Sequence, residues 1–198
     1  MKRGCLRNRN SARRVLALAD CECEDCQAGG YCTYRFRKDR LRWFLGTVKE
    51  MKQVGVLVIA ESPPVSGDYI HRPETRHKAG SLYTRLKTVA AEAPFNIEKP
   101  FFNRVYSDSW LVVDCALCHL DSLDEGTKRN SLFHCFDWGT KVILSELDLS
   151  RVRYCLIAQP GLGSMGPASS KTKIKWLTDG LREEIPEGTR VYACSPWG

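Results

Sequence analysis

Four short apolar runs stand out along the chain, and each has the length of a β-strand. The first, GVLVIA at 55–60, contains no polar side chain, which is typical of a strand covered on both faces of a sheet. The three later runs have similar lengths and lie at 110–113, 154–158 and 190–194. The pattern therefore predicts four strands in the order in which these runs occur.

Apolar residues recur at helical spacing between these runs. Residues 11–19 predict a short helix, and 36–53 predict a longer amphipathic helix. The side of the longer helix opposite its apolar stripe is expected to carry Arg37, Lys38, Arg40 and Arg42. Residues 20–34, between the two helices, are expected to form a cysteine-rich loop.

Three more helices are expected farther along the chain. The first is spaced by Leu82, Leu86, Val89 and Ala93. The next is longer, with Thr127 as a candidate N-cap, and its apolar positions are Leu132, Phe133, Phe136, Ile143 and Leu147. The last has Ser169 or Ser170 as candidate cap and carries Ile174, Leu177 and Leu181.

This alternation of strands and helices predicts one α/β unit: a three-layer α/β/α fold with a four-stranded parallel sheet. Ligands of such sheets bind beyond the carboxyl ends of the strands. The segments at those ends are polar or turn-forming, and they are Glu61–Pro64, Asp114–Cys115, Gln159–Gly161 and Ser195–Gly198. We therefore expect the functional surface at this edge.

The net charge of +7 is confined to the first quarter of the chain. Residues 1–53 carry 13 Lys and Arg against six Asp and Glu, whereas 54–198 carry 17 of each. We expect a basic N-terminal segment, 1–53, packed as one unit with an α/β domain, 54–198. A basic arm on a neutral body indicates a polyanionic partner such as nucleic acid, and the alternative is a solvated terminus.

Membrane insertion and export are not indicated by the sequence. No apolar run approaches the roughly 20 residues that span a bilayer. The apolar run after Arg13-Arg14 has five residues, Val15–Ala19, and a signal peptide needs about 7–15. We expect a cytoplasmic monomer with no membrane partner, whose ten cysteines are thiols or metal ligands rather than disulfides.

Two acidic residues end apolar strands and are the first candidates for chemistry. Glu61 leaves a fully apolar strand and enters a Pro-Pro turn that restricts the backbone. A carboxylate at the mouth of a pocket can orient or deprotonate a water molecule, and the alternative is that it caps neighbouring amides. Asp114 ends the second strand, so the sequence predicts two acids that face one cleft.

Several segments resemble the uracil-DNA glycosylase superfamily. VLVIAESPPVSGDY at 56–69 is similar to the family's first motif, in which a buried strand runs into an acidic, proline-containing turn followed by an aromatic residue. WLVVDCALC at 110–118 resembles the second-strand segment of the members that carry a four-iron cluster. The stretch from His134 to Ala158 resembles their next helix and strand, and RVYACSPWG at 190–198 resembles the strand before the family's last loop.

The resemblance implies a DNA base-excision glycosylase of uracil-DNA glycosylase-like fold that hydrolyses the bond between a base and its sugar. Such an enzyme extrudes the base from duplex or single-stranded DNA into a pocket. Glu61 is implied to position the water or to stabilise the sugar cation, and Asp114 lies beside it. The base pocket is implied to comprise Ser62, Pro63, Pro64, Tyr69 and His119. Ser195 and Pro196 are implied to approach the DNA phosphate or the minor groove beside the lesion.

The sequence departs from the family at two positions. Cys194-Ser195-Pro196 stands where the family has a histidine, and His119 is a candidate substitute. Leu111 stands near the place of an asparagine that reads the base edge. These departures indicate either that the substrate is not uracil or that activity is weak or lost. The resemblance as a whole implies uracil or another deaminated base as substrate. The alternatives are a non-catalytic nucleic-acid-binding protein and a small-molecule nucleotide-binding α/β enzyme.

The cysteines predict a metal site with two alternative ligand sets. Cys21, Cys23, Cys26 and Cys32 lie within 12 residues, and close thiolates favour a bound metal such as zinc. The resemblance instead implies a 4Fe-4S cluster held by Cys23, Cys26, Cys118 and Cys135, with Cys115 as an alternative to Cys118. Thiols without a metal are the third possibility.

A glycine-rich loop follows the third strand. Gly161–Gly166 matches the dinucleotide-binding spacing G-x-G-x-x-G, but no acidic residue ends the following strand to hold a ribose. Contact with DNA phosphate through Ser164 is the favoured interpretation, because a helix N-terminus that follows favours anions. Lys171 and Lys173 add positive charge there, unless they form only a solvated face.

Overall fold

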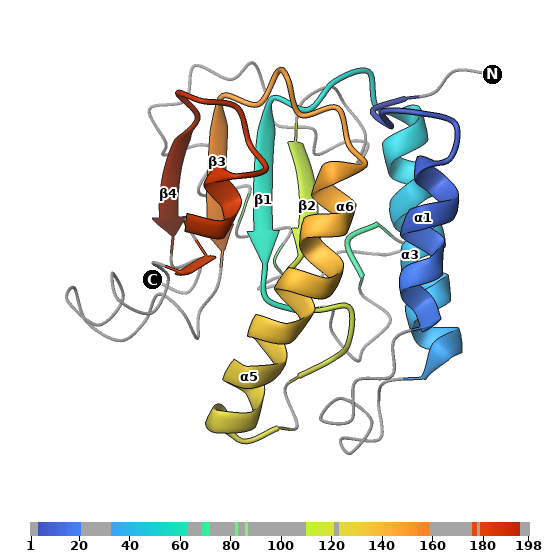
Figure 1. Ribbon diagram of the computed structural model, residues 1–198, viewed down its shortest axis with the longest axis vertical. Coiled ribbons are helices and arrows are strands. Elements are labelled where there is room, and N and C mark those ends of the chain that lie inside the picture. The colour runs from blue at the N-terminus through green and yellow to red at the C-terminus, as the bar shows by residue number, and fades with distance from the viewer. Residues whose placement is uncertain are drawn as a thin grey trace.

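The molecule is built on a four-stranded parallel sheet with helices packed against it (Figure 1). The computed structural model describes residues 4–20, 33–62, 69–71, 82, 86, 110–120, 123–158, 176–177 and 179–194. The strand order is β2-β1-β3-β4. The strands are β1 (Val56–Ala60), β2 (Trp110–Asp114), β3 (Tyr154–Ala158) and β4 (Arg190–Cys194). The predicted strands and their parallel arrangement are confirmed, with β2 one residue longer than expected.

Strand β1 lies between β2 and β3, which explains its uniformly apolar sequence. All five of its residues are buried. Ala60 is in register with Asp114 on one side and with Ala158 on the other, so the three strands end at the same level. The carboxyl ends of the strands form the lower edge of the sheet in Figure 1.

The two faces of the sheet bury different sets of side chains. Leu57 and Ile59 of β1 belong to a large cluster that includes residues from the helices and from the N-terminal arm. Val56, Val58 and Ala60 alternate with them and face a second cluster that contains Tyr69, Ile70 and Leu86. The large cluster draws on residues from Cys5 to Ile185, so the N-terminal segment packs into the same core as the sheet.

Two helices from the N-terminal segment stand side by side next to strand β2 (Figure 1). They are α1 (Ser11–Ala17), continued by the 3-10 turn η1 (Leu18–Asp20), and α3 (Tyr34–Glu50). Helix α3 is capped by Thr33, whose hydroxyl accepts a hydrogen bond from the amide of Phe36. The expected helices at 11–19 and 36–53 are thus present. The first begins at the predicted residue, and the other three ends differ by two or three residues.

The predicted polar side of α3 is wrong for two of its four basic residues. Arg37 and Arg40 are buried, at 4% and 6% exposure, rather than solvated. The Nε of Arg37 donates to the carbonyl oxygen of Ala19, which joins α3 to the turn η1. The guanidinium of Arg40 lies over the rings of Phe36 and Tyr69, 3.9 and 4.7 Å from their centroids.

The helical segment in front of the sheet runs as α5 (Glu125–Cys135), the π-helical turn η2 (Phe136–Thr140) and α6 (Lys141–Ser145). Asp124, not Thr127, is the N-cap, because its carboxylate accepts hydrogen bonds from the amides of Gly126 and Thr127. The hydroxyl of Thr140 lies 2.8 Å from the carbonyl oxygen of Cys115 and fixes this helix to the end of β2.

The N-terminal arm is held against the far end of α6. Leu6 forms an antiparallel bridge with Leu147, and Arg7 donates from Nε to the carbonyl oxygen of Leu147. The carboxylate of Glu146 accepts from the Ser11 hydroxyl at 2.6 Å and pairs with Arg14 at 2.8 Å. Part of the basic arm is therefore structural. No helix within the described residues is both long and apolar enough to cross a membrane.

Replacement of Gly4 by alanine is expected to loosen this arm. Gly4 has a φ of +54°, and a Cβ there would lie 2.1 Å from the carbonyl oxygen of Val48. We expect Gly4→Ala to lower the free energy of unfolding by at least about 2 kcal/mol, as urea denaturation would show. The matched control is Gly46→Ala in the exposed face of α3, where no atom other than the adjacent helix backbone and chain neighbours lies within 4 Å of the added methyl group. That control should raise stability by up to about 1 kcal/mol, and an equal effect of the two substitutions contradicts the account.

Candidate functional site

Glu61 lies immediately after β1, at the carboxyl edge of the sheet. The β1–β2 ladder continues past the strands, with the Cys115 amide donating to Ala60 and the Ala116 amide donating to the carbonyl oxygen of Glu61 at 2.9 Å. The backbone of Glu61 is therefore fixed by the sheet. Its side chain is 10% exposed and forms an ion pair with Lys128 of α5.

The ion pair of Glu61 joins the end of β1 to the first turns of α5. The Lys128 side chain is 17% exposed, so both charges are largely removed from water. A carboxylate held this way is oriented by a fixed cation at the edge where ligands of parallel sheets bind. Lys128 carries no recognisable signal in the sequence, because a lysine in a helix is usually a solvated residue.

Removal of the lysine is expected to destabilise the protein. Lys128→Met leaves a largely buried carboxylate without its counter-charge and should cost about 3 kcal/mol of unfolding free energy. Adding Glu61→Gln should return part of that loss, because a neutral amide needs no counter-charge. Urea unfolding of the wild type, both single variants and the double variant measures the coupling. Strictly additive effects would show that the pair is not a stabilising contact.

Asp114 ends β2, but its side chain lies on the other face of the sheet from that of Glu61. Asp114 is in register with Ala60, and successive residues of a strand point to opposite faces. Glu61 meets α5 on the face of the large cluster, whereas Asp114 contacts Tyr69, a member of the second cluster. The expectation that the two acids face one cleft is therefore wrong, because their positions in the ladder differ by one residue.

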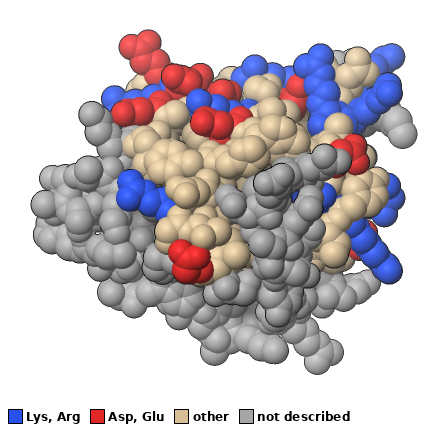
Figure 2. Space-filling model, turned by 60° about the horizontal axis from the view of Figure 1, so that its bottom comes forward, with Lys and Arg blue, Asp and Glu red and all other residues tan. Residues whose placement is uncertain are grey.

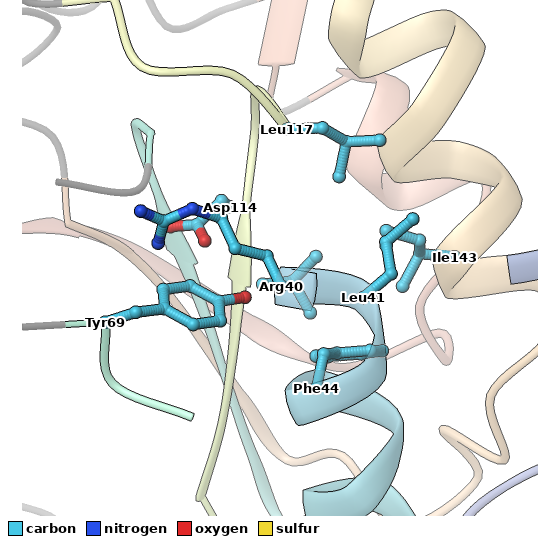
Figure 3. Close-up of a pocket in the computed structure, with 8 residues that line it drawn as sticks. Arg40, Leu41, Phe44, Tyr69, Asp114, Leu117 and Ile143 are labelled. Atoms are coloured by element: carbon cyan, nitrogen blue, oxygen red, sulfur yellow. The ribbon is translucent and has the colours of Figure 1, made fainter. Parts of the chain in front are cut away.

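Asp114 is the centre of a buried polar cluster. Tyr69 donates its phenolic hydrogen bond to the Asp114 carboxylate. Burial raises the pKa of Asp114 to about 7, and the Arg40 cation and the Tyr69 hydrogen bond offset part of this rise. Figure 3 shows the guanidinium of Arg40 and the ring of Tyr69 beside this carboxyl. The three side chains come from α3, from the segment 69–71 and from β2.

Tyr69 is enclosed, which bears on its predicted role as a wall of the base pocket. It is 6% exposed, and burial together with the Asp114 carboxylate raises its pKa well above the ordinary tyrosine range. The cavity lined by Arg40, Tyr69 and Asp114 has a volume of about 10 Å³, enough for at most one water molecule. Ligand pockets span roughly 300 Å³ or more, so this cavity does not hold a nucleobase.

His71 extends the same buried cluster and was not singled out from the sequence. It is 2% exposed, its Nε2 lies 2.7 Å from the carbonyl oxygen of Val112, and its Nδ1 lies 3.2 Å from the hydroxyl of Thr47. Burial lowers the pKa of His71 to about 4, so the ring is neutral near pH 7. The Nε2 then donates to Val112, and Nδ1 is the acceptor facing Thr47.

The described cysteines supply two of the four predicted cluster ligands, Cys118 and Cys135, and none of the predicted zinc ligands. Cys115, Cys118 and Cys135 are all buried in the large cluster. The Cys115 thiol lies 3.7 Å from the carbonyl oxygen of Leu132 and donates to it, which does not suit a thiolate ligand. Cys118 is disulfide-bonded, which contradicts the expectation of thiols or metal ligands rather than disulfides, and it must be reduced before it can bind a metal. Within the described part of the chain, no three His, Cys, Asp or Glu residues are grouped to hold a metal ion.

The remaining predicted site residues divide into two sets. Ser62 is half-buried directly after Glu61, and His119 is buried after β2. The others lie outside the described residues, and they are Pro63, Pro64, Ser164, Lys171, Lys173, Ser195, Pro196, Cys21, Cys23, Cys26 and Cys32.

The chain was compared with protein-family models, with curated proteins and with solved structures. None of the three comparisons finds a match.

Proposed function

We propose that the protein is a DNA glycosylase of the uracil-DNA glycosylase type, which hydrolyses the bond between a deaminated base and deoxyribose. The observation that carries this proposal is the Glu61 carboxylate, fixed by the β-ladder and by Lys128 at the carboxyl edge of a parallel sheet. The motif resemblance around this residue supports the same chemistry. The four-stranded parallel sheet supports it at the level of the fold.

Glu61 acts on the water in this mechanism. The bond between C1′ of the sugar and the base nitrogen breaks, and the electron pair leaves with the base. A water molecule oriented by the carboxylate forms the new C1′–O bond, and its proton passes to Glu61 and then to solvent. The negative charge of the carboxylate also stabilises the positive charge that develops on the sugar. Lys128 positions the carboxylate and does not contact the reacting atoms.

Asp114 has no part in this mechanism. Its contacts with Tyr69 and Arg40 are internal, and it lies on the other face of the sheet. We therefore assign it to the support of segment 69–71. Catalysis rests on Glu61 alone among the predicted acids.

A 4Fe-4S cluster held by Cys23, Cys26, Cys118 and Cys135 remains part of the proposal, with zinc as the alternative metal. Cys118 and Cys135 are buried in one hydrophobic core, which would exclude water from the sulfur ligands of a metal site. Cys118 would become a ligand only after its disulfide is reduced. Such a cluster holds segments together and supplies no step of the hydrolysis. Iron, acid-labile sulfide and zinc analysis of protein purified without oxygen decides between the two metals, and the absence of all three overturns the metal proposal.

The function is tested with oligonucleotides that each carry one uracil, hypoxanthine or xanthine. After incubation with the protein, alkali breaks the strand wherever a base has been removed. We expect cleavage at the modified position of at least one of these substrates. Binding without cleavage of any of them would favour a non-catalytic nucleic-acid-binding protein, in agreement with the small volume of the cavity beside Tyr69.

A further inference from the structure

The outward side of the first half of α3 carries an aromatic ring among cations. Tyr34 is 46% exposed, and the side chains of Arg35 and Arg42 are 93% and 58% exposed. Lys38 lies between them and is half-buried. Positions 35, 38 and 42 share one face of a helix, because they are three and four residues apart. We refer to Tyr34, Arg35, Lys38 and Arg42 as the basic face.

The exposed cations are not required by the packing of α3. Arg37 and Arg40 of the same helix are buried and serve the fold, whereas the cations of the basic face point outward. Asp39 is the acid among them, and its pairs with Arg35 and Arg42 have lengths of 4.0 and 3.6 Å. Exposed pairs of this kind contribute little to stability. Because three cations stand against one acid, the face keeps a net positive charge.

Tyr34 is held in place by its neighbour. Lys38 donates a hydrogen bond to the Tyr34 hydroxyl, and its ammonium lies 4.6 Å from the ring centroid. The first turn of α3 contains no acidic residue, so the partial positive charge of the helix N-terminus adds to that of the side chains. An exposed, fixed ring beside cations is the combination that single-stranded nucleic acids use for stacking and for phosphate contact.

The basic face lies toward the edge of the sheet that carries Glu61. Helix α3 begins below the carboxyl ends of the strands in Figure 1 and runs upward past them. Arg40, which lies beside Asp114, belongs to the same half of the helix. Figure 2 brings this edge forward and shows Lys and Arg gathered on the side of α1 and α3.

We propose that the basic face binds a single-stranded stretch of nucleic acid, with its phosphates on Arg35, Lys38 and Arg42 and one base stacked on Tyr34. The inference rests on the proposed function for the choice of DNA. It adds a binding surface on a helix outside the loops at the strand ends.

The test measures binding of a fluorescent oligothymidylate by anisotropy over a range of salt concentrations. Neutralising three phosphate contacts with R35Q/K38Q/R42Q should reduce the slope of log K against log salt by about 2. Tyr34→Ala should weaken binding about tenfold with the slope unchanged, and Tyr34→Phe should restore most of the affinity. The matched control, R151Q/R182Q/R190Q, removes three exposed cations, of which Arg151 and Arg190 lie at the amino ends of β3 and β4.

The control should leave the salt slope closer to that of the wild type than the basic-face variant does. Equal slopes for the two triple variants, or unchanged affinity on loss of the basic face, would overturn the inference. This result is distinguishable from failure of the proposed function. If R35Q/K38Q/R42Q binds and releases the base as the wild type does, the basic face is not a binding surface and the proposed enzymatic function stands. If the wild type binds DNA through the basic face but releases no base, the proposed function fails and the binding surface stands.

Discussion

Glu61→Gln is expected to lower the rate of base release by about a thousandfold while changing DNA affinity little. The amide keeps the size of the side chain but neither accepts a proton nor carries the charge that stabilises the sugar cation. General-base assistance contributes about 10² to 10⁴ to a rate. The rate constant with enzyme in excess over a uracil-containing oligonucleotide measures this effect without interference from product release.

The matched control for Glu61→Gln is Glu146→Gln. Glu146 is also a buried glutamate in an ion pair, with Arg14, and it accepts a hydrogen bond from Ser11. These contacts lower its pKa, the Ser11 hydrogen bond most strongly. Because Glu146 lies after α6 and away from the carboxyl edge, its substitution should reduce stability but leave base release intact. Equal losses of activity in the two variants would mean that Glu61 acts through stability alone.

The second large effect is a pH dependence of stability that arises from Asp114. Its pKa rises from 3.8 to about 7 on folding, so the folded state holds the proton more tightly than the unfolded state. The stabilisation from this group is fully present below about pH 4 and is lost as pH rises toward 7. A shift of this size corresponds to about 4 kcal/mol. Asp114→Asn should therefore gain stability relative to the wild type by roughly that amount between pH 4 and pH 7.

His71 acts in the opposite direction over most of the same range. Its pKa falls from 6.5 to about 4 on folding, so its contribution is present above pH 6.5 and is lost as pH falls toward 4. This change amounts to about 3 kcal/mol. The two contributions oppose each other in the wild type between about pH 4 and 6.5. Urea unfolding across this range should show stability rising with pH in Asp114→Asn and falling with pH in His71→Gln, and parallel profiles for the two variants would contradict both assignments.

The sheet was predictable because each strand has a recognisable apolar pattern in its own local sequence. Continuous apolar runs such as VLVIA at 56–60 occur where a strand is covered on both faces, and β1 is the strand between two neighbours. The position of Glu61 at the carboxyl edge followed from the same run. Its placement needed no knowledge of distant contacts.

The faces of the site could not be predicted in the same way. Glu61 and Asp114 both end strands, but the register of β1 against β2 decides which face of the sheet each side chain meets. A shift of one residue in the register moves a side chain to the opposite face. Lys128 meets Glu61 only through the packing of α5 on the sheet, which no local pattern encodes.

The burial of Arg40 did leave a signal in the sequence. Phe36, Arg40 and Phe44 are spaced four residues apart, so Arg40 lies on the apolar stripe of α3 rather than opposite to it. Its charge led to the expectation of a solvated position. In the structure the charged side chain is buried on the apolar stripe because its guanidinium lies over aromatic rings and beside Asp114.

The most direct test of the central claim is quantification of free base by mass spectrometry, with wild-type protein and an oligonucleotide that carries one uracil, hypoxanthine or xanthine. We predict that at least one oligonucleotide yields an equivalent of free base and an abasic sugar, and that Glu61→Gln releases the same base about a thousandfold more slowly. Folded, DNA-bound wild-type protein that liberates no base from any of the three would contradict the catalytic role of Glu61.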